Sequence, residues 1–186
     1  MKATHNPYNP GAGVPPPELA GRDNLVDIAR VAIARAKGGR PAKSAIMLGL
    51  RGVGKTVLLN AFEAIAEEEG CQTALLEIDP GTPLAQQLAP QLQHILHRLD
   101  RGKKAGNEVQ KAFGALRSFA SMFKATVGDV DFGFAVTPAT GDLSIDLTDL
   151  FVAIAEAAKK RDTAVILLID EIHTLIGAGS ASGGTL

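Results

Sequence analysis

The chain has 186 residues, of which 46% are hydrophobic and 21% charged, a composition that is typical of a globular domain and excludes wholesale disorder. Lys and Arg number 19 and Asp and Glu 20, giving a formal charge of -1, so the chain as a whole carries no electrostatic footprint for nucleic acid. Its single cysteine, Cys71, excludes an internal disulfide framework. The sequence contains neither the ~20-residue apolar run of a spanning helix nor the apolar core of a signal peptide, so we expect a cytoplasmic protein without a membrane partner.

Prolines dominate the N-terminus and predict an extended arm over residues 1–20. We expect the domain proper to span residues 21–186. A helix is predicted next, because apolar residues recur at helical spacing until Gly38 and Gly39 end the pattern. Its inward face is expected to comprise Leu25, Ile28, Ala29, Ala32, Ile33 and Ala36.

The middle of the chain alternates strand and helix patterns. Residues 44–49 (SAIMLG) form a short apolar run that predicts a strand, and a glycine-rich turn leads from it into a helix predicted over residues 56–69. A second strand is predicted over residues 72–78 and a helix over residues 83–101. We interpret residues 102–141 as an insertion that contains a helix near residues 109–123 and a hairpin strand at residues 127–136.

The last predicted helix opens at Asp146, which forms a capping arrangement with Asp149. Its inward face is expected to comprise Leu147, Leu150, Phe151, Ile154 and Ala158. The continuous apolar run at residues 164–169 is typical of a strand buried on both faces, as in parallel sheets covered by helices. The alternation as a whole predicts a three-layer α/β fold with a mostly parallel sheet.

A phosphate loop is predicted at residues 49–56. GLRGVGKT fits the pattern G-x-x-x-x-G-K-[ST] between a predicted strand and a predicted helix. Its glycines let successive amides turn around a phosphate at a helix N-terminus, while Lys55 reaches the β- and γ-phosphates and Thr56 offers a hydroxyl to Mg²⁺. The competing interpretation, a glycine turn with a solvated lysine, leaves the flanking strand and helix unexplained. The residues expected to contact the nucleotide are Gly49, Leu50, Arg51, Gly52, Val53, Gly54, Lys55, Thr56 and Val57.

Two adjacent carboxylates, Asp170 and Glu171, end the last predicted strand, at the sheet edge where open α/β proteins bind ligands. Asp170 is predicted to hold Mg²⁺, and Glu171 to orient and deprotonate an attacking water. Glu171 and Lys55 are therefore the catalytic candidates. The alternative is a solvated acidic pair at the start of a loop, which the phosphate loop upstream disfavours.

Three motifs in order, LAGRDNLVDI (19–28), GLRGVGKT (49–56) and LLIDEIH (167–173), resemble the AAA+ branch of P-loop ATPases. The likeness is greatest to bacterial ATP-binding proteins related to origin-recognition and signal-transducing ATPases. It implies a three-layer α/β/α P-loop NTPase that binds ATP with Mg²⁺. It also implies an adenine pocket, with the start of a helix at Gly21 and Arg22 as the alternative interpretation. The residues carried over to that pocket are Leu19, Ala20, Gly21 and Arg22.

The end of the chain departs from this family pattern. The stretch after the acidic pair resembles the first nucleotide domain of Clp-type unfoldases, and the sequence ends at Leu186. We therefore expect a domain truncated after the Walker B strand, without the lid domain or arginine finger of AAA+ proteins, and hence slow hydrolysis by this chain alone. An ATPase that drives a partner, a nucleotide-dependent binding switch and a fragment of a Clp-type unfoldase stay open as functions.

The partner is expected to be another protein or a second copy of the chain. DNA has one local support, a basic stripe of Lys104, Lys111, Arg117 and Lys124 within the insertion. His94 and His97 have a spacing that suits a metal but lack a third ligand, so we expect surface histidines. His173 is either a sensor of the γ-phosphate or an ordinary loop residue.

Overall fold

The computed structural model describes residues 22–50, 52–100, 106–124 and 139–174. Within these ranges the chain forms helices and strands in the order α1, α2, β1, α3, α4, α5, β2. The helices are Asp23–Lys37 (α1), Lys55–Glu68 (α2), Leu84–Asp100 (α3), Asn107–Met122 (α4) and Leu143–Lys159 (α5), and the strands are Gln72–Glu77 (β1) and Val165–Asp170 (β2). The predicted arm at residues 1–20 and the predicted hairpin strand at residues 127–136 lie outside the described residues.

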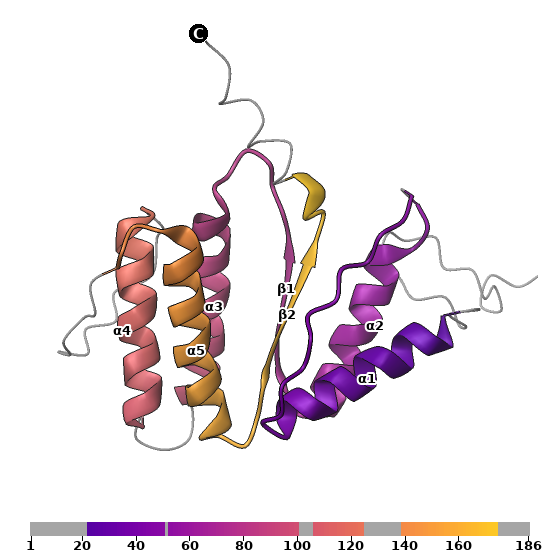
Figure 1. The fold of residues 1–186 in the computed structure, drawn as a ribbon, viewed down its shortest axis with the longest axis horizontal. Helices are drawn as coiled ribbons and strands as arrows, with labels where there is room; N and C mark the ends of the chain where they lie inside the picture. The colour runs from indigo at the N-terminus through magenta and orange to yellow at the C-terminus, as the bar shows by residue number, and fades with distance from the viewer. Residues whose placement is uncertain (1–21, 51, 101–105, 125–138, 175–186) are drawn as a thin grey trace, which may run out of the picture.

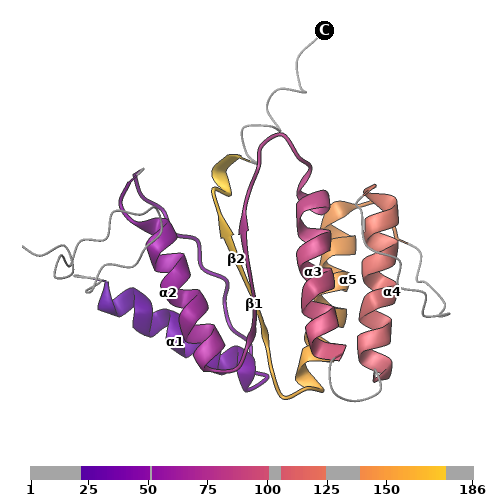
Figure 2. The same cartoon turned by 180° about the vertical axis from the view of Figure 1, so that it is seen from behind.

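The two strands form a parallel sheet with helices on both faces. Gln72 pairs with Val165 and Glu77 with Asp170, so β1 and β2 end at the same edge. Helices α1 and α2 lie on one side of the sheet and α3 and α5 on the other, while α4 packs on the outside of α3 and α5 (Figures 1 and 2). This layered arrangement confirms the predicted α/β fold class.

Two buried clusters hold the helices to the sheet. The larger cluster joins β1 to α3, α4 and α5 and includes Leu92, Leu116 and Ile154. The smaller cluster joins α1 and α2 to the other side of the sheet and includes Ile33 and Ile65. Apolar residues at helical spacing thus face the sheet in α2 and α3, and α4 confirms the helix predicted near residues 109–123.

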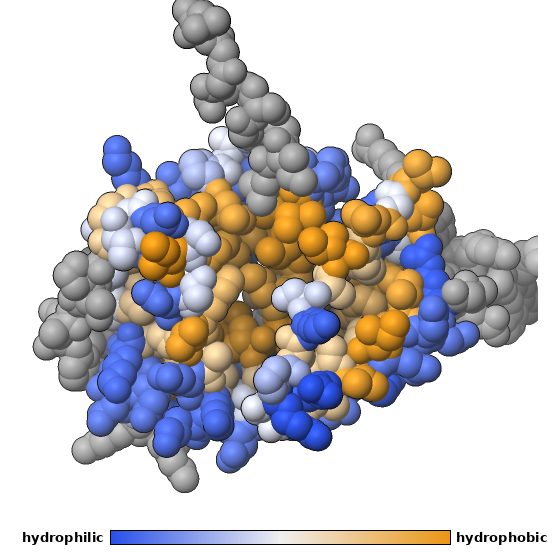
Figure 3. Space-filling view, viewed as in Figure 1, coloured by the Kyte–Doolittle hydropathy of each residue, from blue (hydrophilic) through white to orange (hydrophobic). Residues whose placement is uncertain are grey.

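The prediction of a strand at residues 44–49 is wrong. The segment has no strand structure, and Ile46 and Leu48 are 73% and 91% exposed. An apolar run becomes a strand only when its main-chain groups pair with a neighbour. Within the described part of the chain, the sheet consists of β1 and β2 alone. On the face of the molecule that Figure 3 shows, hydrophobic side chains gather in the middle, between α5 and the segment that precedes α2.

The predicted inward faces of two helices need correction. In α1, Ile33 is buried and Val26 packs against the smaller cluster, whereas Leu25 and Ile28 are exposed, Ile28 by 60%. Ala29, Ala32 and Ala36 of the predicted face are half-buried, so the prediction fails only at Leu25 and Ile28. In α5, Phe151 is exposed although it was predicted to face inward, while its neighbour Leu150 is buried.

The capping residue of α5 is Asp142, and the prediction of Asp146 in that place is wrong. The Asp142 carboxylate accepts hydrogen bonds from the amides of Ser144 and Ile145. Asp146 lies in the first turn instead, where it is buried and accepts from the amide and the hydroxyl of Thr140 and from the amide of Gly141. The Thr140 amide is the main cause that lowers the pKa of Asp146.

None of the helices in the described ranges is both long and apolar enough to cross a bilayer.

Candidate nucleotide site

The phosphate loop, residues 49–56, leads directly into the N-terminus of α2. Gly52 and Gly54 have φ angles of 80° and 82°, in the left-handed region that side chains with a Cβ rarely adopt. Gly54 is the N-cap of α2, so the loop turns straight into amides that carry the partial positive charge of a helix N-terminus. Of the residues predicted to contact the nucleotide, Arg51 lies outside the described residues.

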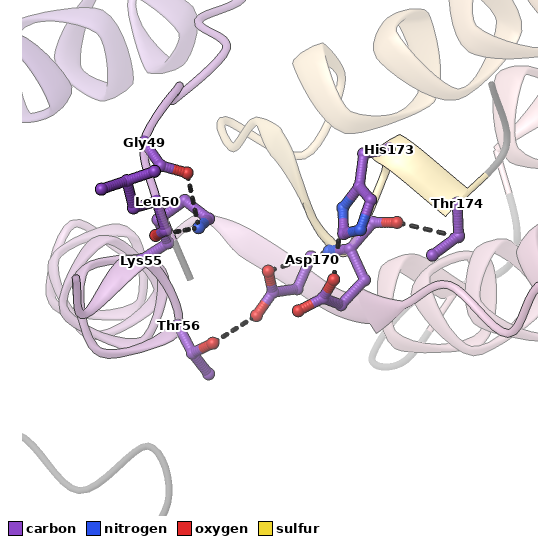
Figure 4. A network of polar contacts seen from close by, with 8 residues as sticks. Gly49, Leu50, Lys55, Thr56, Asp170, His173 and Thr174 are labelled. Carbon is purple, nitrogen blue, oxygen red and sulfur yellow. Dashed lines mark hydrogen bonds and ion pairs between the residues drawn. The ribbon is translucent and has the colours of Figure 1, made fainter. Parts of the chain in front are cut away.

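Lys55 begins α2, and its side chain folds back over the loop. Its Nζ donates hydrogen bonds to the carbonyl oxygens of Gly49 and Leu50, at 3.2 and 3.0 Å (Figure 4). The ammonium group is thereby held at the start of the phosphate loop. A phosphate inside the loop would offer this nitrogen charged acceptors, which form stronger hydrogen bonds than carbonyl oxygens.

Thr56 and Asp170 meet although they are 114 positions apart in the sequence. Thr56 Oγ1 donates to Asp170 Oδ2 at 2.5 Å, and the amide of Glu171 donates to Asp170 Oδ1 at 2.9 Å (Figure 4). Asp170 is 9% exposed, so the carboxylate is both largely enclosed and fixed at each oxygen. The contact joins the first turn of α2 to the carboxyl end of β2.

This pair fits the predicted magnesium site. The Thr56 hydroxyl directs its proton to Asp170, which leaves its oxygen lone pairs for a cation. Mg²⁺ commonly binds one or two protein oxygens together with phosphates and waters. A site of that kind needs no larger ligand cluster, and the described residues contain no group of three or more His, Cys, Asp or Glu that could hold a metal.

Glu171 leaves β2 in an unusual conformation, with a φ of 55°. Non-glycine residues seldom adopt this left-handed region, and when they do it is often at a functional site. Glu171 Oε2 lies 3.2 Å from His173 Nδ1, and the Glu171 carbonyl accepts from the hydroxyl and the amide of Thr174 (Figure 4). The ring of His173 thus contacts the carboxylate that was predicted to activate water.

Arg22 lies against the phosphate loop. Its Nη1 donates to the Gly54 carbonyl at 3.2 Å, and its Nη2 donates to the Val53 carbonyl. The other residues expected in an adenine pocket, Leu19, Ala20 and Gly21, lie outside the described residues. Sequence reasoning missed the contact of Arg22 with the loop, because a bond between residues 31 positions apart leaves no local pattern.

The histidines set aside from the sequence lie away from this site. His94 and His97 are exposed on α3 and line a polar groove along β1, together with Glu63 and Glu67 of α2. The His97 ring also contacts Phe113, with ring centroids 5.1 Å apart. Their exposure agrees with the prediction of surface histidines.

The comparisons with known proteins support the family that the motifs indicate, and nothing finer. A family model described as an AAA ATPase domain matches residues 18–182, which include the phosphate loop, Asp170 and Glu171. No curated protein and no solved structure matches the chain. The finer likenesses, to origin-recognition-like proteins and of the tail to Clp-type unfoldases, have no support in these comparisons and stay predictions.

Proposed function

Since the chain belongs to the AAA ATPase domain family, we propose that it binds Mg-ATP in the phosphate loop and hydrolyses it with Glu171, so that the cycle drives or switches contact with a partner. The observation that carries this proposal is the 2.5 Å hydrogen bond between Thr56 and Asp170. It brings the acidic end of β2 to the loop, where a triphosphate and its cation would meet.

Binding would begin at the loop itself. The amides at the N-terminus of α2 and the left-handed turns at Gly52 and Gly54 favour an anion. Lys55 Nζ would exchange the carbonyl oxygens of Gly49 and Leu50 for phosphate oxygens. No large rearrangement is needed, because this nitrogen already lies over the loop.

The oxygens of Thr56 and Asp170 would hold Mg²⁺, in agreement with their contact and with the burial of Asp170. When bound, this ion neutralises charge on the β- and γ-phosphate oxygens. The amide of Glu171 keeps the second carboxylate oxygen of Asp170 in place.

Glu171 would act as the general base. Its carboxylate takes a proton from water as the water oxygen attacks the γ-phosphorus and the bond from that phosphorus to the ADP oxygen breaks. His173 Nδ1 lies 3.2 Å from Oε2 of this carboxylate, and the second oxygen, Oε1, would take the proton.

A titration of labelled ATP, with and without Mg²⁺, tests the binding step. We expect Lys55→Ala to weaken ATP binding by at least about tenfold, because a charge-assisted bond to phosphate is lost. Lys43→Ala is the matched control, since Lys43 is an exposed lysine ahead of the loop. Equal affinities of wild type and Lys55→Ala would contradict the proposal.

A second function, a nucleotide-dependent switch with little hydrolysis, is favoured by the pairing of Glu171 with His173. The variant Glu171→Gln distinguishes the two functions. An ATPase should lose roughly 10²-fold or more in turnover while it retains ATP, whereas a switch should change little in either property. Steady-state phosphate release and ATP titration on the same samples measure both.

The partner is proposed to be a protein or a second copy of the chain. DNA is the weaker proposal: Lys111, Arg117 and Lys124 are exposed on or just after α4, and Lys104 lies outside the described residues. Retention of duplex DNA on a filter at low salt would favour DNA, because contacts to phosphates strengthen as salt falls. No retention would remove DNA as a partner.

A further inference from the structure

We infer that Arg22 is a positioning residue of the phosphate loop, which orients its main chain toward phosphate, and that it does not read the base. This inference rests on the proposed nucleotide site. Arg22 Nη1 donates to the carbonyl of Gly54 and Nη2 to that of Val53. One guanidinium group thus holds two consecutive peptide units.

Because the peptide bond is planar, holding these two carbonyls also fixes the direction of the amides that follow them. In a trans peptide the carbonyl and the following amide point in opposite directions, and the described residues contain no cis peptide. When the carbonyls of Val53 and Gly54 face Arg22, the amides of Gly54 and Lys55 therefore point to the other side of the loop. Successive amides on one side are what an anion-binding nest requires.

The contact also stabilises the turn at Gly54. Glycine leaves a left-handed conformation easily, because it has no Cβ to restrict it. The Gly54 carbonyl is fixed by two donors, Arg22 Nη1 at 3.2 Å and the amide of Leu58 at 3.1 Å. A Cβ added to Gly54 would lie 3.7 Å from both terminal nitrogens of Arg22, so the guanidinium packs directly on this residue.

Arg22 is itself anchored at the N-terminus of α1. Its carbonyl accepts from the amides of Leu25 and Val26, at 2.9 and 3.1 Å. Helix α1 is in turn joined to α2 by the smaller buried cluster, which contains Ile33 and Ile65. The main chain of Arg22 is therefore fixed relative to α2, which allows its side chain to hold the loop in one position.

The two roles of Arg22 predict different ligand dependences. A residue that reads adenine changes the affinity for ATP and leaves a ligand without a base untouched. A residue that orients the loop changes the affinity for every ligand with a triphosphate by the same factor. ATP, GTP and inorganic tripolyphosphate, each with Mg²⁺, are therefore the probes.

The experiment compares the full chain with Arg22→Ala, Arg22→Lys and Arg30→Ala. Arg30 is exposed on α1 and serves as the matched control. We expect Arg22→Ala to weaken binding of all three probes by about tenfold, as loss of a charged hydrogen-bond donor would. Arg22→Lys should recover part of this loss, because an ammonium keeps the charge but lacks the planar fork. Arg30→Ala should change nothing.

Hydrogen exchange gives a readout that needs no ligand. Without nucleotide, Arg22→Ala should speed amide exchange over residues 49–59 and leave exchange in α3 and α4 unchanged. Unchanged exchange in the loop would overturn the inference, and so would a loss of ATP affinity with tripolyphosphate affinity intact. If wild type binds none of the probes, the proposed function fails, while the exchange comparison still decides whether Arg22 orders the loop.

Discussion

The carboxylate of Asp170 shows how single hydrogen bonds define the site, since each of its oxygens has one donor. Removing the Thr56 hydroxyl should separate metal binding from phosphate binding. We expect Thr56→Val to lose about tenfold in ATP affinity with Mg²⁺ and little without it, because the hydroxyl is a proposed ligand of the cation.

Thr56→Ser is the control, since it keeps the hydroxyl and should keep the magnesium effect. ATP titrations with and without Mg²⁺ measure both variants. The proposed cation site is wrong if Mg²⁺ enhances ATP binding equally in Thr56→Val and wild type.

Asp146 gives a pH dependence whose sign follows from its hydrogen bonds. The Thr140 amide and the other donors lower its pKa in the folded chain, so the carboxylate stabilises the fold above the ordinary pKa range of aspartate and ceases to do so as pH falls through the lowered pKa. We expect Asp146→Asn to lower the thermal midpoint at neutral pH.

The difference between Asp146→Asn and wild type should shrink in strongly acidic solution, where the wild-type carboxylate is protonated as well. Thermal unfolding followed by circular dichroism over a pH series checks this. A difference that stays constant over the whole series would show that ionisation of Asp146 contributes nothing.

At the scale of elements, α5 depends on its cap. Asp142 accepts from the amides of Ser144 and Ile145, which otherwise lack helical partners at this terminus. Asp142→Ala should therefore lower the free energy of unfolding by about 1 kcal/mol. Asp149→Ala, an exposed aspartate of the same helix, is the control, and urea titrations measure both. Equal losses in the two variants would contradict the assignment of the cap.

Elements whose apolar residues have one clear period were predictable from the sequence. Helix α3 buries Leu88, Leu92 and Leu99 as its spacing indicates, and the apolar run that became β2 lies within one residue of its predicted bounds. The apolar composition of residues 44–49 did not suffice to predict their structure, since a strand forms only by pairing with a neighbour, and this segment is not a strand. In α1, Ile33 is buried as predicted, whereas Leu25 and Ile28 are exposed and Val26 packs against the smaller cluster instead.

In the candidate site too, some features could be predicted from the sequence and others could not. The phosphate loop and the acidic pair were recognisable as motifs, because each consists of consecutive residues next to an element with a clear pattern, the loop before α2 and the pair at the end of β2. The partners of those residues were not. Arg22 reaches Val53 and Gly54 through the packing of α1 on α2, and His173 reaches Glu171 because the chain turns with a positive φ.

At the scale of the whole molecule, the two buried clusters on opposite sides of the sheet share no residue. Ile33→Val and Ile154→Val each remove one methylene, from the smaller and the larger cluster respectively. Each should cost about 0.5–1.5 kcal/mol, and the double variant should lose the sum within about 0.5 kcal/mol. Denaturant unfolding of the four proteins checks this, and a larger deviation would indicate coupling across the sheet.

The hydrogen bond between Thr56 and Asp170 encloses most of the folded chain, since its ends are 114 positions apart in the sequence. A ligand that bridges these two side chains would close a ring through α2, both strands and the α3–α5 layer. Its binding free energy would then oppose global unfolding as well as loosening of the loop. Resistance to proteolysis at sites distant from the ligand, for example in α4, would consequently report its occupancy.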